Sequence, residues 1–221
     1  MKTVILIVLN IDTAESKELF ELLNGLPLAI AQAAAYLRQS RAKVSKYIKL
    51  YRQQWKSLME SQDRTGTRLR DYSDRSVWTT WTISYNAVRE KSIVAANLLL
   101  LWACLDHKDL WYGLLSEAAV AGYLSEWLPD IISEVEFIAA MQLLGSYSLV
   151  EDIQDLESYT IRPVVHRWAF YMQDEEQRAV FTRLGIVVVG WAVPHSSQRE
   201  HSLIQYRLLP HAQRCWEWIK R

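Results

Sequence analysis

The feature that most constrains the fold of this chain is the spacing of its apolar residues, which recur at intervals of three and four. The clearest case is the segment 44–59, whose other face carries Lys and Gln and whose apolar positions are Val44, Tyr47, Ile48, Tyr51, Trp55, Leu58 and Met59. This spacing is that of an amphipathic helix. Only 7 Gly and 5 Pro occur in 221 residues, too few for a many-turned all-β chain, while half of the residues are apolar. The sequence therefore predicts a globular, mainly α-helical protein.

The charge balance and the cysteine content argue against binding to nucleic acid or membranes and against a disulfide-linked fold. It has 25 Lys+Arg against 25 Asp+Glu, so bulk electrostatics do not attract it to nucleic acid or to an anionic membrane. Cys104 and Cys215 provide neither a disulfide framework nor a CxxC motif. No apolar stretch approaches the roughly 20 residues of a membrane helix, and the run Val4 to Leu9 is short for a signal peptide. We expect a cytoplasmic protein that contacts no membrane.

Start and stop signals divide the chain into short elements. Val4 to Leu9 reads as a buried strand, and Asp12 with Glu15 can cap a helix that stops at Gly25. Pro27 suits the first turn of a second helix, 27–39. Further helices are expected at 44–60, 76–90, 91–105, 111–121, 133–144, 164–173, 175–192 and 200–220. Two β-like pieces, 147–151 and 159–162, flank the acidic loop 152–157, and Gly145 is expected to end the helix before them.

The order of these elements predicts three parts. The polar stretch 61–76 interrupts the apolar periods around it and is placed as a boundary. Residues 1–62 then form a helical-bundle subdomain. Residues 76–174 carry four expected helices before a hairpin, and the last three of these directly precede the hairpin, the order of a winged-helix domain with a small β-hairpin wing. Residues 175–221 form a C-terminal helical extension.

The sequence does not support a catalytic or metal-binding motif. The glycines of Gly185 to Gly190 have the spacing of a phosphate loop, but Trp191 stands where the lysine must be. The five histidines lack zinc-ligand spacing, with His195 and His201 expected in solvent, and Cys104 lies in an apolar run where a thiolate is disfavoured. The sequence therefore predicts no enzyme and no metal site.

A winged helix raises the question of DNA binding. The helix that would enter the groove, 133–144, carries Glu134 and Glu136 and no Lys or Arg. Two carboxylates facing phosphates lower affinity, and the acidic loop 152–157 makes the wing repulsive as well. A docking module is favoured over a nucleic-acid reader.

Three separated segments stand out: Gly25-Leu26-Pro27-Leu28-Ala29-Ile30, SVWTTWTISY at 76–85, and Arg162-Pro163-Val164-Val165-His166-Arg167-Trp168. Together they resemble one family, the NB-ARC (STAND-type) nucleotide-switch ATPases in the form found in filamentous fungi. The first resembles the GLPLA motif of that family, the second is similar to the first helix of the winged-helix segment that follows, and the third resembles the MHD motif. Leu208-Leu209-Pro210-His211-Ala212 is similar to the entry into a tetratricopeptide array.

The resemblance implies two nucleotide contacts. In the family the GLPLA proline packs against the nucleotide and the MHD histidine approaches the phosphates of ADP, which by position would be Pro27 and His166. The chain lacks the P-loop lysine and the magnesium-binding Ser/Thr, so ATP hydrolysis is not expected, and ADP or ATP would be held only when a nucleotide-binding half is supplied. Simpler interpretations stand beside these: Pro27 as a helix-start proline, and His166 as a core or capping histidine.

The favoured function is a non-catalytic regulatory or protein-interaction module derived from an NB-ARC switch protein. It would act in intracellular signalling of the incompatibility or innate-immunity type, with ADP sensing as a further expectation. Its partner would be a protein, including an intact NB-ARC/TPR protein. The alternatives are a truncated gene product without independent function and a winged-helix DNA-binding regulator. The last helix is expected to expose an apolar face, formed by Leu203, Ile204, Leu208, Leu209, Trp216 and Ile219.

Overall fold

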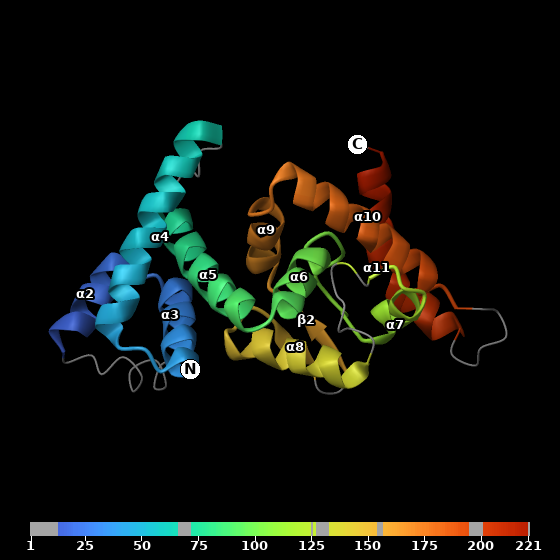
Figure 1. The fold of residues 1–221 in the computed structure, drawn as a ribbon, viewed down its shortest axis with the longest axis horizontal. Coiled ribbons are helices and arrows are strands. Elements are labelled where there is room, and N and C mark those ends of the chain that lie inside the picture. The colour runs from blue at the N-terminus through green and yellow to red at the C-terminus, as the bar shows by residue number, and fades with distance from the viewer. Residues whose placement is uncertain are drawn as a thin grey trace. The chain divides into compact units, whose positions relative to one another are not determined.

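The computed structural model describes residues 13–65, 72–124, 126, 133–153, 157–194 and 201–220. In these ranges the protein is mainly helical, with a small two-stranded antiparallel sheet (Figure 1). The expected fold class is confirmed at this level. The chain divides into two compact units, the first formed by Met1–Ala87 and Ser146–Ser148 and the second by Val88–Gly145 and Leu149–Arg221. The expected strand Val4 to Leu9 lies outside the described residues.

The first unit contains α2 (Ala14–Leu22), α3 (Pro27–Ser40), α4 (Val44–Thr65) and most of α5 (Tyr72–Lys91). Thr13 caps α2, because its side-chain oxygen accepts a hydrogen bond from the Ser16 N–H at 3.2 Å. The expected cap, Asp12, lies outside the described residues. Pro27 occupies the first turn of α3, as expected for a proline whose missing N–H would have no partner there.

A buried glutamine ties the first unit together. Gln32 on α3 is 3% exposed, and its Nε2 donates to Ser84 Oγ on α5 at 2.9 Å and to the Tyr147 carbonyl at 2.6 Å. A buried amide whose hydrogens are both used fixes the register of the segments it joins. Positions 32, 84 and 147 are far apart in sequence, so this contact is a purely tertiary feature.

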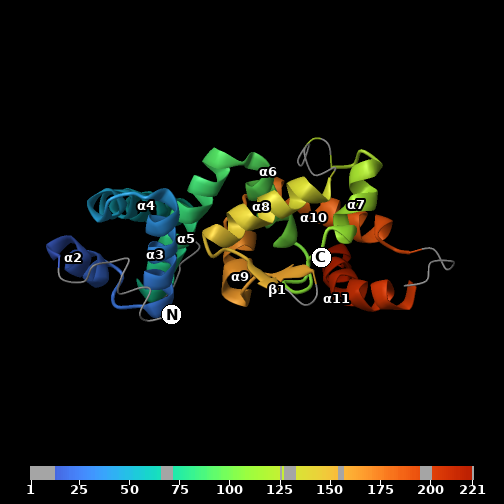
Figure 2. The ribbon, with the colours of Figure 1, turned by 90° about the horizontal axis from the view of Figure 1, so that it is seen from below.

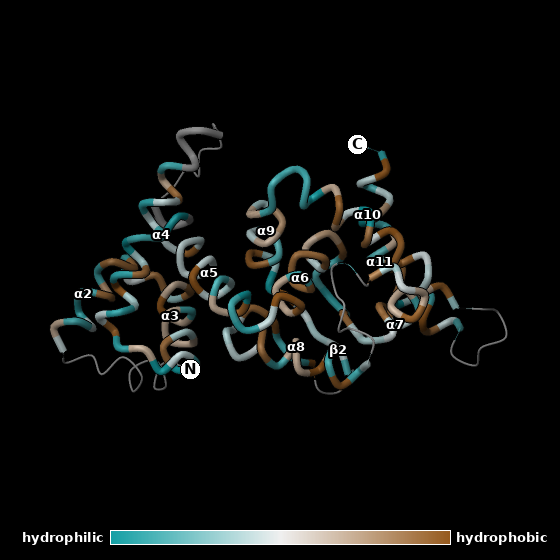
Figure 3. The backbone as a smooth tube through the Cα atoms, viewed as in Figure 1, coloured by the Kyte–Doolittle hydropathy of each residue, from teal (hydrophilic) through white to brown (hydrophobic). Residues whose placement is uncertain are grey.

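The second unit is built around α6 (Ile93–Trp102), which is apolar over most of its length (Figure 3). Every residue of α6 except Ile93 and Asn97 is buried. Helix α10 (Glu175–Trp191) packs against α6, α7 (Gly113–Val120) and α11 (His201–Ile219). Residues 185–190 therefore form part of a packed helix rather than a phosphate-binding loop.

The small sheet lies between α8 (Glu134–Ser146) and α9 (Pro163–Tyr171) in the chain (Figure 2). Strands β1 (Glu151–Ile153) and β2 (Ser158–Thr160) pair antiparallel with Asp152 opposite Tyr159. Leu110 adds an isolated antiparallel bridge to Tyr159, which extends the hairpin on its β2 side. The acidic segment is thus partly strand, since Asp152 belongs to β1, while residues 154–156 lie outside the described ranges.

Two expectations about this region are wrong. Gly145 does not end α8, which continues to Ser146 and turns at Ser148, where φ is +55°. The Leu149 N–H donates to the Leu144 carbonyl at 3.1 Å, the 6→1 bond of a Schellman motif with Ser148 as its left-handed residue. Because this turn consumes residues 147–150, the first strand begins at 151 rather than 147.

The expected domain limits and the observed units differ in position. The boundary between the units falls within α5, after Ala87. The polar stretch 61–76 instead supplies the end of α4 and the start of α5, and only its residues 66–71 lie outside the described ranges. Helices α10 and α11, expected as a separate extension 175–221, pack in the second unit. On α11 the expected apolar face is present at Leu203, Leu209, Trp216 and Ile219, each more than half exposed, but Leu208 is buried. No helix in the described ranges has the length and apolarity to cross a membrane.

Candidate functional site

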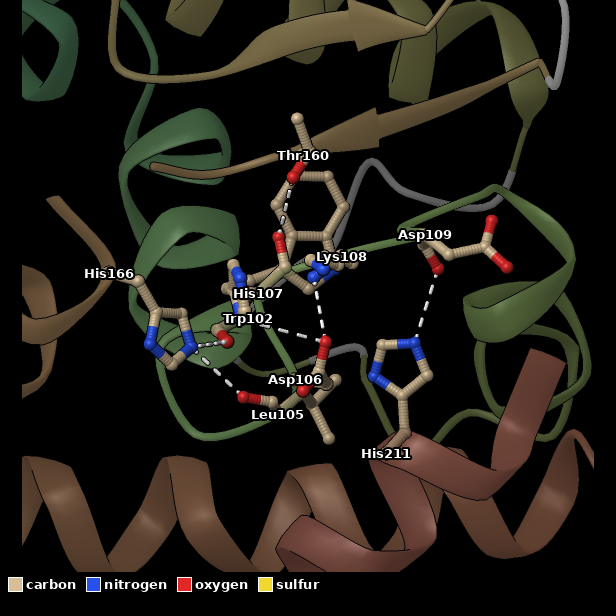
Figure 4. Close-up of polar contacts among 9 residues, drawn as sticks. All are labelled: Trp102, Leu105, Asp106, His107, Lys108, Asp109, Thr160, His166 and His211. Atoms are coloured by element: carbon tan, nitrogen blue, oxygen red, sulfur yellow. Dashed lines mark hydrogen bonds and ion pairs between the residues drawn. The ribbon is translucent and has the colours of Figure 1, made fainter. Parts of the chain in front are cut away.

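The segment 103–112 between α6 and α7, here called the α6–α7 loop, receives contacts from several elements of the second unit (Figure 4). Strand β2 holds one side of it: Leu110 and Tyr159 exchange backbone hydrogen bonds at 2.9 and 2.8 Å. The His107 carbonyl accepts from the Ile161 N–H at 2.9 Å and from Thr160 Oγ1 at 3.0 Å. The loop is therefore bound to the hairpin through its backbone.

His166 binds the loop from the first turn of α9. Its Nε2 lies 3.1 Å from the Trp102 carbonyl oxygen and 2.9 Å from the Leu105 carbonyl oxygen (Figure 4). A carbonyl only accepts hydrogen bonds, so Nε2 carries the hydrogen and neutral His166 presents a lone pair at Nδ1. Burial lowers the pKa of His166, although the two backbone carbonyls act in the opposite direction. The side chain thus satisfies carbonyls at the C-terminal end of α6, the role of a capping residue.

Helix α11 contacts the loop both near its start and near its end. Arg207 Nε and Nη2 donate to the two carboxylate oxygens of Asp109 at 2.8 and 2.6 Å, and the guanidinium lies 4.1 Å from the centroid of the Trp111 ring. Trp218 Nε1 donates to the Cys104 carbonyl at 2.8 Å. Bidentate pairing with a carboxylate requires the planar guanidinium, so this contact is specific to arginine.

His211 makes a second contact from α11 to Asp109. The residue is fully buried, and its Nε2 donates to the Asp109 carbonyl at 3.2 Å (Figure 4). Its Nδ1 is buried without a hydrogen-bond partner among the described residues. Burial is the largest influence on His211 and lowers its pKa, so the neutral ring is favoured.

A cavity of about 330 Å³ opens between this loop, α9 and α11. Its charged lining residues are Asp106 and Glu217, both acidic, and Arg214. Arg214 Nη1 is 2.7 Å from Glu217 Oε2, and its guanidinium lies 4.5 Å from the Trp218 ring centroid. The complete lining is Leu105, Asp106, His107, His166, Pro210, Gln213, Arg214 and Glu217. In the described part of the chain, no group of three or more His, Cys, Asp or Glu side chains is arranged to hold a metal ion.

The two residues singled out from the sequence lie in different units. Pro27 is exposed at the start of α3 in the first unit, and His166 lines the cavity of the second. The geometry of His166 is that of the capping alternative, because Nε2 is already donated to backbone carbonyls.

Sequence reasoning missed the roles of Asp109, Arg207 and His211. The available signal was modest: a polar run, Asp106 to Asp109, that directly follows the apolar segment 93–105. Nothing local indicated which distant residues would bind it.

Comparison with known proteins gives one informative match. No protein-family model matches the chain, and no solved structure matches it. The chain is 25% identical over 159 residues to a nucleotide-binding leucine-rich repeat (NLR)-like protein of Hyaloscypha variabilis. The match covers 68% of this chain and 14% of that protein. It supports a relationship to NLR-like proteins and so bears out the coarser part of the resemblance noted in the sequence.

Proposed function

We propose that this chain is a non-catalytic regulatory and protein-interaction module of the NB-ARC type, in which the α6–α7 loop couples the hairpin and α9 to α11. The similarity to an NLR-like protein supports a role in signalling. A hairpin that follows several helices and is extended by Leu110 supports the winged-helix assignment for this part of the chain.

The observation that carries the proposal is the way the loop is held. His166 of α9 contacts carbonyls at 102 and 105, whereas Arg207 of α11 contacts the side chain at 109. A shift of the loop therefore alters the hydrogen bonds of both helices. Such a shared element is the physical basis by which an event at one helix changes the stability of another.

A double-mutant cycle tests this coupling. His166→Ala, Arg207→Ala and the double variant are compared by native-state hydrogen exchange, which gives the free energy of opening for amides of α11. If the loop couples α9 to α11, the effects of the two substitutions on the free energy of opening are non-additive by about 0.5 kcal/mol or more. The matched control pairs His166→Ala with Arg52→Ala, because Arg52 forms an ion pair with Glu18 in the first unit. Additivity of His166→Ala and Arg207→Ala to within about 0.3 kcal/mol would refute the coupling.

ADP sensing is the finer part of the proposal. A neutral His166 with Nε2–H donated to carbonyls has no second N–H for a phosphate oxygen, and burial opposes the protonation that would supply one. We therefore propose that nucleotide binding needs a nucleotide-binding half from elsewhere. Isothermal titration of residues 1–221 with ADP, beside His166→Ala and Pro27→Ala, tests this. No heat is expected, and micromolar binding lost in both variants would show that this chain reads the nucleotide by itself.

A further inference from the structure

We infer that the cavity between the α6–α7 loop, α9 and α11 is a binding site for a basic side chain, arginine or lysine, presented by a protein partner. The inference rests on the proposed interaction function and assigns a ligand chemistry to it. The cavity is lined by Asp106, His166, Arg214, Glu217 and the other residues named above.

Residues of this cavity carry hydrogen-bond acceptors that the described contacts do not use. His166 donates through Nε2, so its other ring nitrogen is an acceptor, and it lies on the opposite side of the ring from the two carbonyls (Figure 4). Asp106 uses Oδ1 to accept from the Lys108 N–H at 2.9 Å, and no described residue donates to its Oδ2. His107 Nδ1 is 3.7 Å from Asp106 Oδ1, too long for a hydrogen bond. A ligand that donates hydrogen bonds would supply the missing partners of these acceptors.

The charge of the lining points to a cation. Besides its two histidines, the charged side chains of the lining are Asp106, Glu217 and Arg214. Glu217 and the Trp218 ring already engage Arg214, so Asp106 has no arginine or lysine partner in the lining. The excess of one negative charge repels phosphate and attracts an ammonium or guanidinium group.

Size and wall chemistry suit a single side chain. At about 330 Å³ the cavity is at the small end of ligand sites, which span roughly 300–1,000 Å³. Leu105 and Pro210 provide apolar wall against which the methylene stem of Arg or Lys can pack while its charged end meets Asp106.

The test follows the histidine ring resonances of the whole chain, 1–221, by NMR at neutral pH and constant ionic strength. The probes are Nα-acetyl-arginine amide, Nα-acetyl-lysine amide and inorganic phosphate. We expect one or both basic probes to shift the His166 and His107 resonances saturably and phosphate to leave them unchanged. Asp106→Asn should weaken the binding by about tenfold or more, because it removes the charge of the acceptor. Asn keeps the oxygen that accepts from the Lys108 N–H, and an unchanged urea midpoint confirms that the variant is folded.

Glu176→Gln is the matched control, since this carboxylate is exposed on α10 and lies outside the cavity lining. It should bind the probes as the unmodified chain does. The inference is overturned if neither basic probe gives a saturable shift, if phosphate alone shifts the histidines, or if Asp106→Asn binds with unchanged affinity. Failure of the coupling cycle alongside saturable binding would instead remove the proposed coupling and leave the site.

Discussion

The contact of Arg207 with Asp109 should be the most costly polar contact of α11 to remove. Both side chains are less than a third exposed, at 23% and 29%, and the geometry is bidentate. The guanidinium also stacks over Trp111. Because the pair is partly desolvated and doubly bonded, it differs from the exposed ion pair of Arg52 and Glu18, in which the side chains are 60% and 41% exposed.

The expected cost follows from these contacts. A hydrogen bond to a charged group contributes about 1.5–3 kcal/mol. Cation–π stacking adds about 0.5–1 kcal/mol. The two bonds share one pair of charges and are partly screened, so we expect Arg207→Ala to lower the free energy of opening of α11 by about 2–3 kcal/mol. Arg207→Lys keeps the charge but loses the bidentate pair of hydrogen bonds, and should lower the free energy of opening of α11 by about 1–2 kcal/mol.

Asp109→Asn gives the matched change on the loop. Asp109 has φ of +53°, a left-handed conformation that Asn also tolerates, so this variant removes the charge without adding backbone strain. Hydrogen exchange of α11 amides and urea unfolding provide the two measurements. Arg207→Ala and Asp109→Asn should be strongly non-additive, since each removes the same interaction. A loss below about 0.5 kcal/mol for Arg207→Ala would refute the reasoning and place the pair among ordinary surface ion pairs.

Three further predictions concern buried groups. Burial lowers the pKa values of His166 and His211, so near pH 6 the folded state binds fewer protons than the unfolded state. The stability that depends on these neutral rings is present above their ordinary pKa of 6.5 and is lost as the pH falls below it. Urea midpoints should fall on acidification, and they should fall less in His166→Gln. A midpoint that rises on acidification would contradict the expected direction of the pH dependence. Gln32→Leu removes the amide that donates to Ser84 Oγ and to the Tyr147 carbonyl, and should lower the free energy of unfolding in urea by about 1–3 kcal/mol. An unchanged urea midpoint would show that the two hydrogen bonds do not stabilise the fold. Burial raises the pKa values of Cys104 and Cys215 to about 11. Iodoacetamide at pH 8 should therefore label these thiols slowly in the folded chain and rapidly in urea. Equal labelling rates would show that both thiols are accessible in the folded chain.

The amino-acid sequence by itself determined the helices, because the signals for a helix are local. Apolar spacing located α4, and Pro27 marked the start of α3. The weaker terminal signals failed where a competing local turn was available: Gly145 permits a helix end but does not require one, and the chain turned at Ser148 instead. The order of helices and hairpin was also predictable, although the first strand begins at 151 rather than at 147.

Only the tertiary structure decided what surrounds the α6–α7 loop. His166 reaches carbonyls 64 and 61 positions earlier in the chain, and Arg207 reaches a carboxylate 98 positions earlier. No local pattern encodes such pairings, because they depend on how α9, α10 and α11 pack on α6. The same packing set the tautomer of His166 and placed Asp106 in the lining of a cavity, so the hydrogen-bonding chemistry of this site arises from the fold rather than from any motif.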